Sequence, residues 1–269
     1  MSERKRDLNI IVCIKQVPST DKVNFNWKTG SLIRDNIENI LNPDDRNAIE
    51  LALEIKEKYG GKVIAITLGP PQAEEVLREA YAMSVDHCIL ITDKNFAGSD
   101  SLVTSKILTR AINKIGKFDI IITGFQSIDG STNNVSYQIA ELLKIPHFTQ
   151  IDEIKIENNS VLVSRLYGHE YQKVKSNLPI LIATKRESNI VRYLKLINIK
   201  KSFEKEIEVW NMDDIGGTEN EYGFKGSPTI TLKGELITQK RKKQEFQGTI
   251  EEKANALILK LKKYGFLRT

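Results

Sequence analysis

The stretch IIITGFQSIDGSTNN, residues 120–134, decides the fold of this chain. It begins with three β-branched residues, passes through Gly124 into a loop of small polar residues, and leads into an apolar-periodic segment that ends at Leu143. A buried strand followed by a glycine-containing loop and a helix start is typical of an α/β protein that presents backbone N–H groups to a phosphate. The stretch therefore predicts a nucleotide site. An ordinary strand-to-helix turn, with Ser and Asp as caps, is the alternative.

The side chains of this loop suit a nucleotide. Ser127, Ser131 and Thr132 supply hydroxyl groups, Asp129 supplies a carboxylate and Gly130 adds little bulk. Hydroxyls donate hydrogen bonds to phosphate oxygens, and a carboxylate suits a ribose hydroxyl or a helix N-cap. A helix over residues 132–143 would direct the positive end of its dipole at the loop.

Composition places the chain among globular α/β proteins. The 269 residues are 28% charged and 40% hydrophobic, and no apolar run reaches transmembrane length. The N-terminal MSERKRDLN lacks the apolar core of a secretory signal. Cys13 and Cys88 lie in apolar runs, and the three histidines show no ligand spacing. We therefore expect buried thiols, no metal site, no membrane insertion and a cytoplasmic location.

The formal charge of +5 comes from lysines spread along the chain, with denser runs at 195–205 and 240–243. No aromatic residues interleave with these runs, and no zinc-finger spacing is present. We therefore expect no nucleic-acid partner, and assign the lysines to solvated surface or to an acidic protein partner.

Strand and helix patterns alternate through the first half of the chain. The expected strands are 8–15, 62–68, 87–92 and 118–123, the expected helices are 42–59, 71–83, 100–114 and 132–143, and a hairpin is expected over 22–35. This order predicts a Rossmann-like, mostly parallel sheet with helices on both faces. Such sheets bind nucleotides outside the carboxyl ends of their strands. The segments expected to meet at that edge are 13–18, 42–45, 68–70 and 123–134.

The pattern changes after Pro146. Short strands at 148–156, 160–166, 169–174 and 178–184 predict antiparallel structure packed on the parallel sheet or extending it. Glycines from residue 216 onward mark an irregular arm, and an amphipathic helix over 249–264 closes the chain. We therefore expect a nucleotide-binding domain over 1–207 and a C-terminal arm over 208–269. The arm would dock on a partner subunit or fold back on its own domain.

Six segments resemble the β subunit of electron transfer flavoproteins over almost the whole chain. They are VCIKQVPST at 12–20, a long segment at 41–93 beginning LNPDDRNAIE, DSLVTSKIL at 100–108, GFQSIDGSTNN at 124–134, LPILIATKRESNIVRY at 178–193, and GFKGSP at 223–228. The order and spacing of these segments together carry the resemblance.

The resemblance implies a heterodimer with a larger α subunit that carries a redox-active FAD. The β site in that family holds AMP in the plain carriers, or a second FAD in the flavin-bifurcating members of anaerobes. The KQVPST segment, the Pro-Asp-Asp helix start, KEIEVW at 205–210 and GFKGSP look closer to the bifurcating branch, which favours FAD. The nucleotide-binding residues that the resemblance implies are Cys13, Lys15, Asn42, Pro43, Asp44, Asp45, Leu68, Gly69, Thr123, Gly124, Phe125, Gln126, Ser127, Ile128, Asp129, Gly130, Ser131, Thr132, Asn133 and Asn134.

The implied function is electron transfer without catalytic side chains, because the cofactor supplies the chemistry. With FAD in the β site, NADH would deliver a hydride, and one electron would pass to the α-subunit FAD and the other to ferredoxin or flavodoxin. With AMP, the subunit would be structural, and the α-subunit FAD would take electrons from an acyl-CoA or other flavin dehydrogenase. A stand-alone adenine-nucleotide-binding regulator on the same scaffold is a third hypothesis.

The chain departs from the bifurcating pattern at several positions. Ser131, Asn133 and Asn134 stand where those relatives usually have Asp, Ala and Gln. Phe125 replaces a basic residue, which weakens the expected attraction for a diphosphate, and Ser136-Tyr137 replaces a Gly-Pro pair. The Asn-Glu-Pro-Arg-Tyr signature appears as NIVRY at 189–193, so partner or flavin contact by its Arg and Tyr is expected, with plain surface packing as the alternative.

Overall fold

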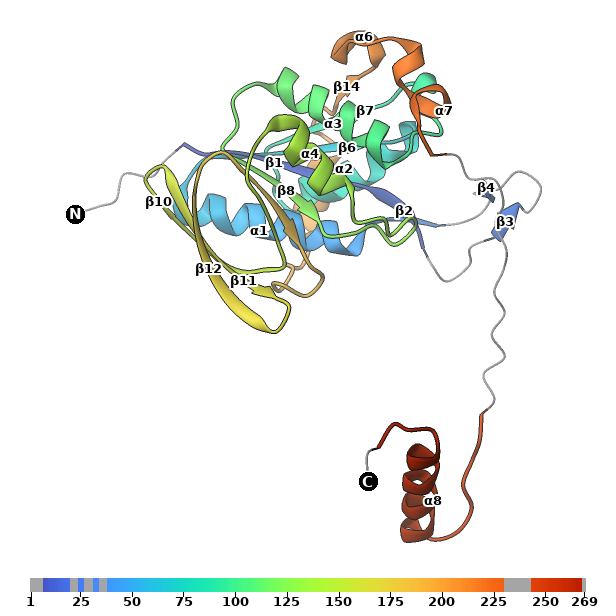
Figure 1. Cartoon of the computed structure of the whole chain (residues 1–269). Coiled ribbons are helices and arrows are strands. Elements are labelled where there is room, and N and C mark those ends of the chain that lie inside the picture. The colour runs from blue at the N-terminus through green and yellow to red at the C-terminus, as the bar shows by residue number, and fades with distance from the viewer. Residues whose placement is uncertain (1–6, 20–23, 27–30, 34–37, 230–242, 268–269) are drawn as a thin grey trace. The chain divides into compact units, whose positions relative to one another are not determined.

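The computed structural model describes residues 7–19, 24–26, 31–33, 38–229 and 243–267 (Figure 1). The chain forms two compact units, one over residues 1–232 and one over 233–269. None of the described helices combines the length and the apolar character that a membrane span requires.

A seven-stranded parallel sheet forms the centre of the first unit. Its strand order is β14-β7-β6-β1-β8-β13-β9, and every neighbouring pair is parallel. The bounds are β1 Asn9–Ile14, β6 Lys62–Leu68, β7 His87–Ile91, β8 Ile120–Gly124, β9 His147–Thr149, β13 Ile180–Thr184 and β14 Glu208–Trp210. The central strands are apolar and buried along nearly their whole length, which is the pattern of a parallel sheet covered on both faces.

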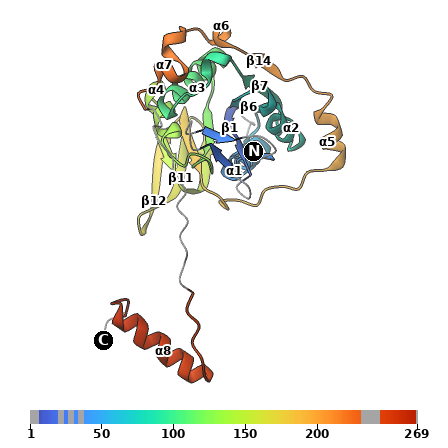
Figure 2. The same ribbon diagram turned by 90° about the vertical axis from the view of Figure 1, so that its right-hand side faces the viewer.

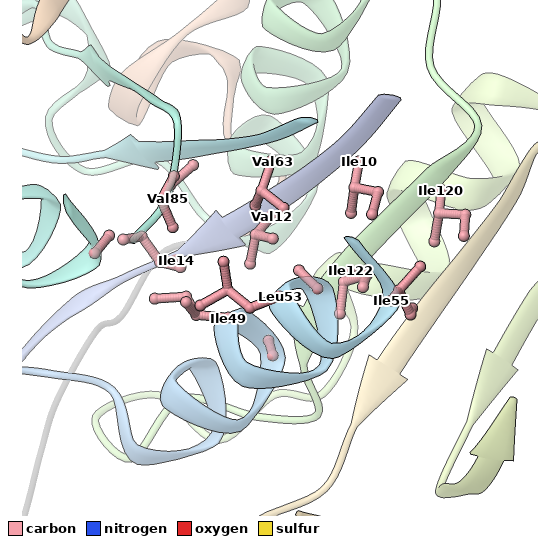
Figure 3. Close-up of a cluster of buried hydrophobic side chains, with 14 of the residues drawn as sticks. Ile10, Val12, Ile14, Ile49, Leu53, Ile55, Val63, Val85, Ile120 and Ile122 are labelled. Atoms are coloured by element: carbon pink, nitrogen blue, oxygen red, sulfur yellow. The ribbon is translucent and has the colours of Figure 1, made fainter. Parts of the chain in front are cut away.

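Helices cover both faces of this sheet, as the sequence predicts. Helices α1 (Pro43–Tyr59) and α2 (Glu74–Ala82) pack on one face, and α3 (Ser101–Ile115) and α4 (Val135–Leu143) pack on the other. Alternate residues of β1 divide between the two cores: Ile10 and Val12 join Ile49 of α1, and Ile11 joins Ile107 of α3. Figure 3 shows the first core, with β1 and β8 side chains pointing towards α1.

The strand order places a topological switch point beside β1. The chain leaves β1 through α1 towards β6, and later returns from β7 through α3 to β8 on the opposite side of β1. The loops after β1 and β8 therefore diverge, to α1 on one face and to α4 on the other. Open α/β sheets bind ligands in the crevice at such a point.

A second sheet of three antiparallel strands follows α4. It consists of β10 (Ile151–Glu157), β11 (Ser160–Tyr167) and β12 (Glu170–Asn177). The antiparallel structure expected after residue 146 is therefore present. The segments at 147–149 and 178–184, which we grouped with it, run parallel in the main sheet instead. The reason lies in ILIAT of β13, which is buried on both faces and lacks the alternation of a one-sided strand.

The remaining elements are short. They are β2 (Gln16–Pro18) paired with β5 (Asn39–Leu41), β3 (Asn24–Asn26) paired with β4 (Ser31–Ile33), the 3₁₀ turns η2 (Pro71–Ala73), η3 (Lys94–Phe96) and η4 (Glu219–Glu221), and helices α5 (Leu196–Ser202), α6 (Met212–Ile215) and α7 (Gly223–Gly226). The β3–β4 pair confirms the expected hairpin, whose predicted turn at 28–30 lies outside the described residues. Figure 2 shows α5 beside α2, where the Arg78 guanidinium donates to the Ser202 carbonyl over 2.6 Å.

Residues 208–229 belong to the first unit and pack against its main sheet and the segment after β7. Strand β14 extends the main sheet, and the buried Tyr222 ring stands edge-on to Phe96 with 5.0 Å between the ring centroids. The expected division into a nucleotide-binding domain over 1–207 and an arm over 208–269 that docks on a partner stays a prediction.

The second unit contains helix α8 (Ile250–Lys263). Thr249 and Glu252 form a reciprocal capping box at its amino end, with the Thr249 N–H donating to the Glu252 carboxylate over 2.7 Å. The helix expected over 249–264 is confirmed.

Candidate functional site

Asn42 joins the start of α1 to the loop after β8. This side chain is buried, and its Nδ2 donates to the Gln126 carbonyl over 2.9 Å. Its Oδ1 accepts from the Ile128 N–H over 3.2 Å. Two segments far apart in the sequence are thus held together at the carboxyl edge of the sheet, as predicted from their places after strands.

The two aspartates that follow Pro43 also hold loop backbone. Asp45 accepts from the N–H groups of Lys15, over 2.7 Å, and Gly124, over 3.1 Å. Asp44 accepts from the Gln126 N–H over 3.3 Å. Burial raises the pKa of both carboxyls, that of Asp45 to about 7, and the hydrogen bonds oppose this rise. Asp44 and Asp45, which the resemblance implies as nucleotide-binding residues, thus accept hydrogen bonds from the backbone at the ends of β1 and β8.

Lys15 and Asp129 form an ion pair across the edge. The Lys15 ammonium lies 2.9 and 2.7 Å from the two Asp129 carboxylate oxygens. Burial opposes ionisation of Asp129, but the ammonium outweighs it, so the pKa of Asp129 is lowered. The pair connects the loop after β1 to the centre of the 123–134 loop.

The end of the loop adopts a local conformation that delays the helix. Ser131 and Asn133 have left-handed φ values of 47° and 56°, and α4 begins at Val135, three residues later than expected. Ser131 closes the turn, because its N–H and its hydroxyl both donate to the Ser127 carbonyl over 3.0 Å.

Two polar atoms at this end of the loop have no hydrogen-bond partner among the residues that the structure describes. They are Oδ1 of Asn133 and Oγ of Ser136, and both are buried. Buried polar atoms in proteins are nearly always hydrogen-bonded, so these two suit a polar ligand. The backbone at Gly124 lies against the start of α1, since a Cβ there would lie 2.2 Å from Asp45 Oδ1. The residues present therefore fit a nucleotide.

The other expected residues lie at the same edge at different depths. Cys13 is buried at the end of β1, and burial raises the pKa of its thiol. Leu68 ends β6, which β1 separates from β8, and Gly69 follows it and donates its N–H to the Ile91 carbonyl over 3.1 Å. Thr123 is buried, and its hydroxyl donates to the Gly124 carbonyl over 2.9 Å.

Sequence reasoning missed Thr184 and Arg186. The buried Thr184 hydroxyl donates to the Thr123 carbonyl over 3.2 Å, and the Thr184 carbonyl accepts from the Phe125 N–H over 2.7 Å. The Arg186 charge favours ionisation of Asp44. The apolar run of β13, which ends at Thr184 and is followed by Lys-Arg, could have indicated another strand end at this edge. We assigned the run to antiparallel structure and therefore did not place its end here.

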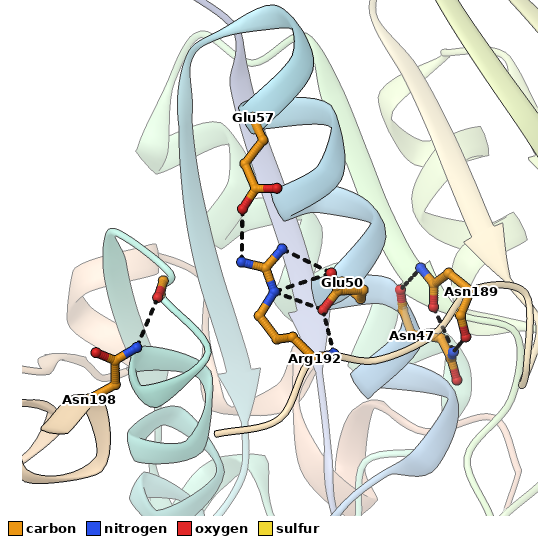
Figure 4. Close-up of polar contacts among 7 residues, drawn as sticks. Asn47, Glu50, Glu57, Asn189, Arg192 and Asn198 are labelled. Atoms are coloured by element: carbon orange, nitrogen blue, oxygen red, sulfur yellow. Dashed lines mark hydrogen bonds and ion pairs between the residues drawn. The ribbon is translucent and has the colours of Figure 1, made fainter. Parts of the chain in front are cut away.

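Arg192 and Tyr193 do not meet the candidate nucleotide edge. Figure 4 shows Arg192 lying along α1, where its guanidinium bonds both oxygens of Glu50, at 2.9 to 3.1 Å, and reaches Glu57 at 2.9 Å. Asn47 and Asn189 exchange amide hydrogen bonds one turn nearer the amino end of the helix. Arg192 and Tyr193 line an open hollow of about 280 Å³ between α1 and the segment after β13. For Arg192 the structure therefore shows packing on its own domain.

Among the residues that the structure describes, no cluster of His, Cys, Asp and Glu is suited to a metal ion. The fold belongs to the doubly wound α/β class, and the candidate site lies where that class binds nucleotides.

Comparison with known proteins gives the family. Residues 29–215 match the electron transfer flavoprotein domain. The chain is 37% identical over 260 residues to the electron transfer flavoprotein subunit beta of Clostridium acetobutylicum, covering 97% of this chain and all of the relative. It is 41% identical over 257 residues to the caffeyl-CoA reductase-Etf complex subunit CarD of Acetobacterium woodii, covering 95% and 98%. It is 39% identical over 262 residues to the acryloyl-CoA reductase electron transfer subunit gamma of Anaerotignum propionicum, covering 94% and 98%. The chain therefore belongs to the electron transfer flavoprotein family, and its resemblance to the β subunits is confirmed.

Proposed function

We propose that this chain is the β subunit of a heterodimeric, cytoplasmic electron transfer flavoprotein with FAD at the carboxyl edge of its sheet. It would pass electrons from NADH or a dehydrogenase to an α-subunit FAD and to a ferredoxin- or flavodoxin-type acceptor. The observation that carries the proposal is the joining of the loops after β1 and β8 to the start of α1, next to two buried, unpartnered polar atoms.

Of the helix starts nearest to β1 and β8, which are those of α1 and α4, the amino end of α4 is the better phosphate site. The first turn of α1 carries Asp44 and Asp45, which already compensate the positive end of its dipole. The first turn of α4 carries no acidic residue, and Ser136 and Asn133 lie there. The residues that would hold the cofactor are therefore those of the 123–134 loop, Lys15 and the start of α4.

A bound flavin would supply hydride acceptance and single-electron transfer, while the residues of this chain bind it, orient it and set its surroundings. Asn42, Asp44 and Asp45 fix the loop that would hold the nucleotide. The names of two relatives place them with caffeyl-CoA and acryloyl-CoA reductases, which supports a flavin dehydrogenase acting on a CoA ester as the electron partner.

The cofactor content of the purified heterodimer tests the proposal. Co-expression with its α subunit should give a yellow complex with two flavins per pair, and NADH should bleach the flavin absorption. One flavin with one AMP per pair would instead identify a plain carrier with structural AMP. A colourless monomer that binds ATP and ignores the α subunit would overturn the proposal in favour of the regulator.

A further inference from the structure

Asp45 bonds the ends of two central strands through a single carboxylate. The residue is 5% exposed, and its two oxygens accept from the N–H of Lys15, just after β1, and from the N–H of Gly124, the last residue of β8. β1 and β8 are neighbours in the sheet, and their loops diverge at this point. The carboxylate therefore fixes the two loops that border the candidate site without lying in the loop that would hold the ligand.

The ionised carboxyl accepts strongly from both amides. In a neutral carboxyl one oxygen carries the proton and is a much weaker acceptor, so the hydrogen bond from one of the two N–H groups weakens. The charge on Asp45 thus decides how firmly both strand ends are held.

The surroundings of Asp45 offer no directly bonded cation among the described residues. The groups that face it are the Asn42 side chain and the Asp44 carboxylate on its own segment, the Cys13 thiol on β1, and the backbone of Lys15 and Gly124, while the Lys15 ammonium is paired with Asp129 and the Arg186 charge acts on Asp44. Asp44 opposes a second negative charge here, and the charge on Asp45 in turn opposes ionisation of the Cys13 thiol.

We propose that Asp45 is a positioning residue, whose carboxylate orders the ends of β1 and β8 for nucleotide binding, and that nucleotide affinity therefore falls when Asp45 takes up a proton. This inference rests on the proposed nucleotide site.

The direction of the pH effect follows from two opposing terms. Burial raises the pKa of Asp45 to about 7, so its charge changes near neutral pH. Protonation removes a charge-assisted hydrogen bond from the frame of the site, whereas it also relieves repulsion of the ligand phosphate. That repulsion is screened at a solvent-facing edge, while the hydrogen bond is direct and buried, so the first effect dominates. Single-site linkage then gives an affinity about tenfold lower at pH 6 than at pH 8.

The experiment measures FAD affinity of the full chain between pH 6 and pH 8 by fluorescence quenching. FAD is the probe because its diphosphate does not titrate in this range, unlike a monophosphate, whose second pKa is about 6. Asp45→Asn keeps the shape of the side chain and mimics the neutral acid. Its affinity should be no higher than that of the unsubstituted chain at pH 6 and should not change with pH.

Asp119 provides a matched control on the same two strands. It is 6% exposed, precedes β8 at the opposite end of the sheet, and accepts from the N–H of Asn9, the first residue of β1, over 2.9 Å. Asp119→Asn should keep the pH dependence of FAD affinity. A parallel pH profile in the unsubstituted chain and Asp45→Asn, or tighter FAD binding at pH 6, would overturn the inference.

Hydrogen exchange of the unliganded chain keeps the inference testable without FAD. At pH 8, protection of the Lys15 and Gly124 amides should be several-fold lower in Asp45→Asn than in the unsubstituted chain. Protection that is equal in the two chains would contradict the positioning role. Absence of FAD and AMP binding at every pH, with the exchange pattern intact, would count against the proposed function alone.

Discussion

The Lys15–Asp129 pair shows how one residue can serve both folding and binding. Asp129 stands in the loop that we expect to hold the nucleotide, yet both of its oxygens contact the Lys15 ammonium in the structure. The Lys15 side chain is 45% exposed, so the pair contributes little to global stability. Its main effect is to fix the position of the loop across the edge of the sheet.

We predict that Asp129→Ala removes the nucleotide from this subunit. The loop loses its tie to Lys15, so affinity should fall at least tenfold, while the free energy of unfolding should change by less than about 1 kcal/mol. The nucleotide released from the acid-precipitated complex measures occupancy. Glu153→Ala, which removes an exposed ion pair with Lys155 on β10, should leave occupancy intact. Unchanged occupancy in Asp129→Ala would refute the role of the loop.

The pH dependence of stability offers a second measurement on Asp45. The folded chain raises the pKa of this carboxyl from 3.8 to about 7, so between these values the folded state binds more protons than the unfolded state. Stability from this residue therefore falls as pH rises through that window. Urea unfolding should show about 2–3 kcal/mol less stability at pH 7 than at pH 5, relative to the same difference in Asp45→Asn. Equal differences in the two chains would contradict the raised pKa.

Arg192 matters for folding because it neutralises a buried carboxylate. The Glu50 side chain is 6% exposed and receives three hydrogen bonds from the guanidinium, and one from the backbone N–H of Arg192. These hydrogen bonds to Glu50 raise the pKa of the Arg192 guanidinium above its usual value.

We predict that Arg192→Ala lowers the free energy of unfolding by about 2 kcal/mol, because it leaves Glu50 buried and unpaired. The value lies below that of a fully buried pair since the Arg192 side chain is 28% exposed. Adding Glu50→Gln should recover part of the loss. Lys225→Ala, which breaks an exposed pair with Glu219, should cost less than about 0.5 kcal/mol. A similar small loss for Arg192→Ala would mean that the contact contributes nothing beyond surface charge.

At the level of elements, the junction of β8 with the start of α1 depends on the absence of a side chain at Gly124. A Cβ there would meet Asp45 Oδ1 at 2.2 Å and Asp44 Cβ at 2.9 Å, and the nearest backbone atom at 3.0 Å. The neighbours belong to a buried helix start, so they cannot move aside without breaking the hydrogen bonds to Lys15 and Gln126.

We predict that Gly124→Ala destabilises the chain by about 1–3 kcal/mol and weakens nucleotide binding, because the overpacked junction pushes the loop away from α1. Thermal unfolding and FAD titration measure the two effects. Gly130→Ala, six residues further along the same loop, should leave stability nearly unchanged, since the nearest atom to an added Cβ is 3.8 Å away. Equal stability in both variants would show that the junction is not tightly packed.

Most of the sheet and its helices could be predicted from the sequence. The central strands are continuous apolar runs, and Asn42-Pro43 and Gly60 mark the bounds of α1. The orientation of β13 was predicted wrongly because we grouped this run with the short strands before it, although a continuous apolar run is typical of a strand buried on both faces. The late start of α4 depends on left-handed residues that are not glycine, which no propensity indicates.

The site was predictable only as a set of strand ends. That rule placed the segments after β1 and β8 and the start of α1 at one edge, and the hydrogen bonds of Asn42 confirm that they meet there. The division of labour among the acids was not predictable. Asp45 is buried and accepts hydrogen bonds from the ends of two strands, while Asp129 pairs with Lys15. These roles depend on burial and on nearby backbone donors, which only the tertiary structure determines.

At the scale of the whole molecule, the two units differ in how far they bury their apolar residues. The first unit buries its strands on both faces. Within the second unit, α8 has no buried residue, and Leu257 and Ile258 are 46% and 43% exposed. An amphipathic helix with its apolar stripe exposed is a candidate for docking on another chain. The proposed α subunit is that chain.

We predict that a chain ending at residue 232 keeps the stability of the sheet and its nucleotide affinity but no longer co-purifies with the α subunit. The truncation removes only the second unit, so the contacts of the main sheet remain. In the full chain, Leu257→Asp should weaken the heterodimer at least tenfold, because it places a charge on the apolar stripe. Ala256→Asp places the same charge on the opposite face of α8, and the complex should tolerate it. Loss of fold in the truncated chain, or equal effects of the two substitutions, would show that α8 serves the fold of this subunit instead of joining it to its partner.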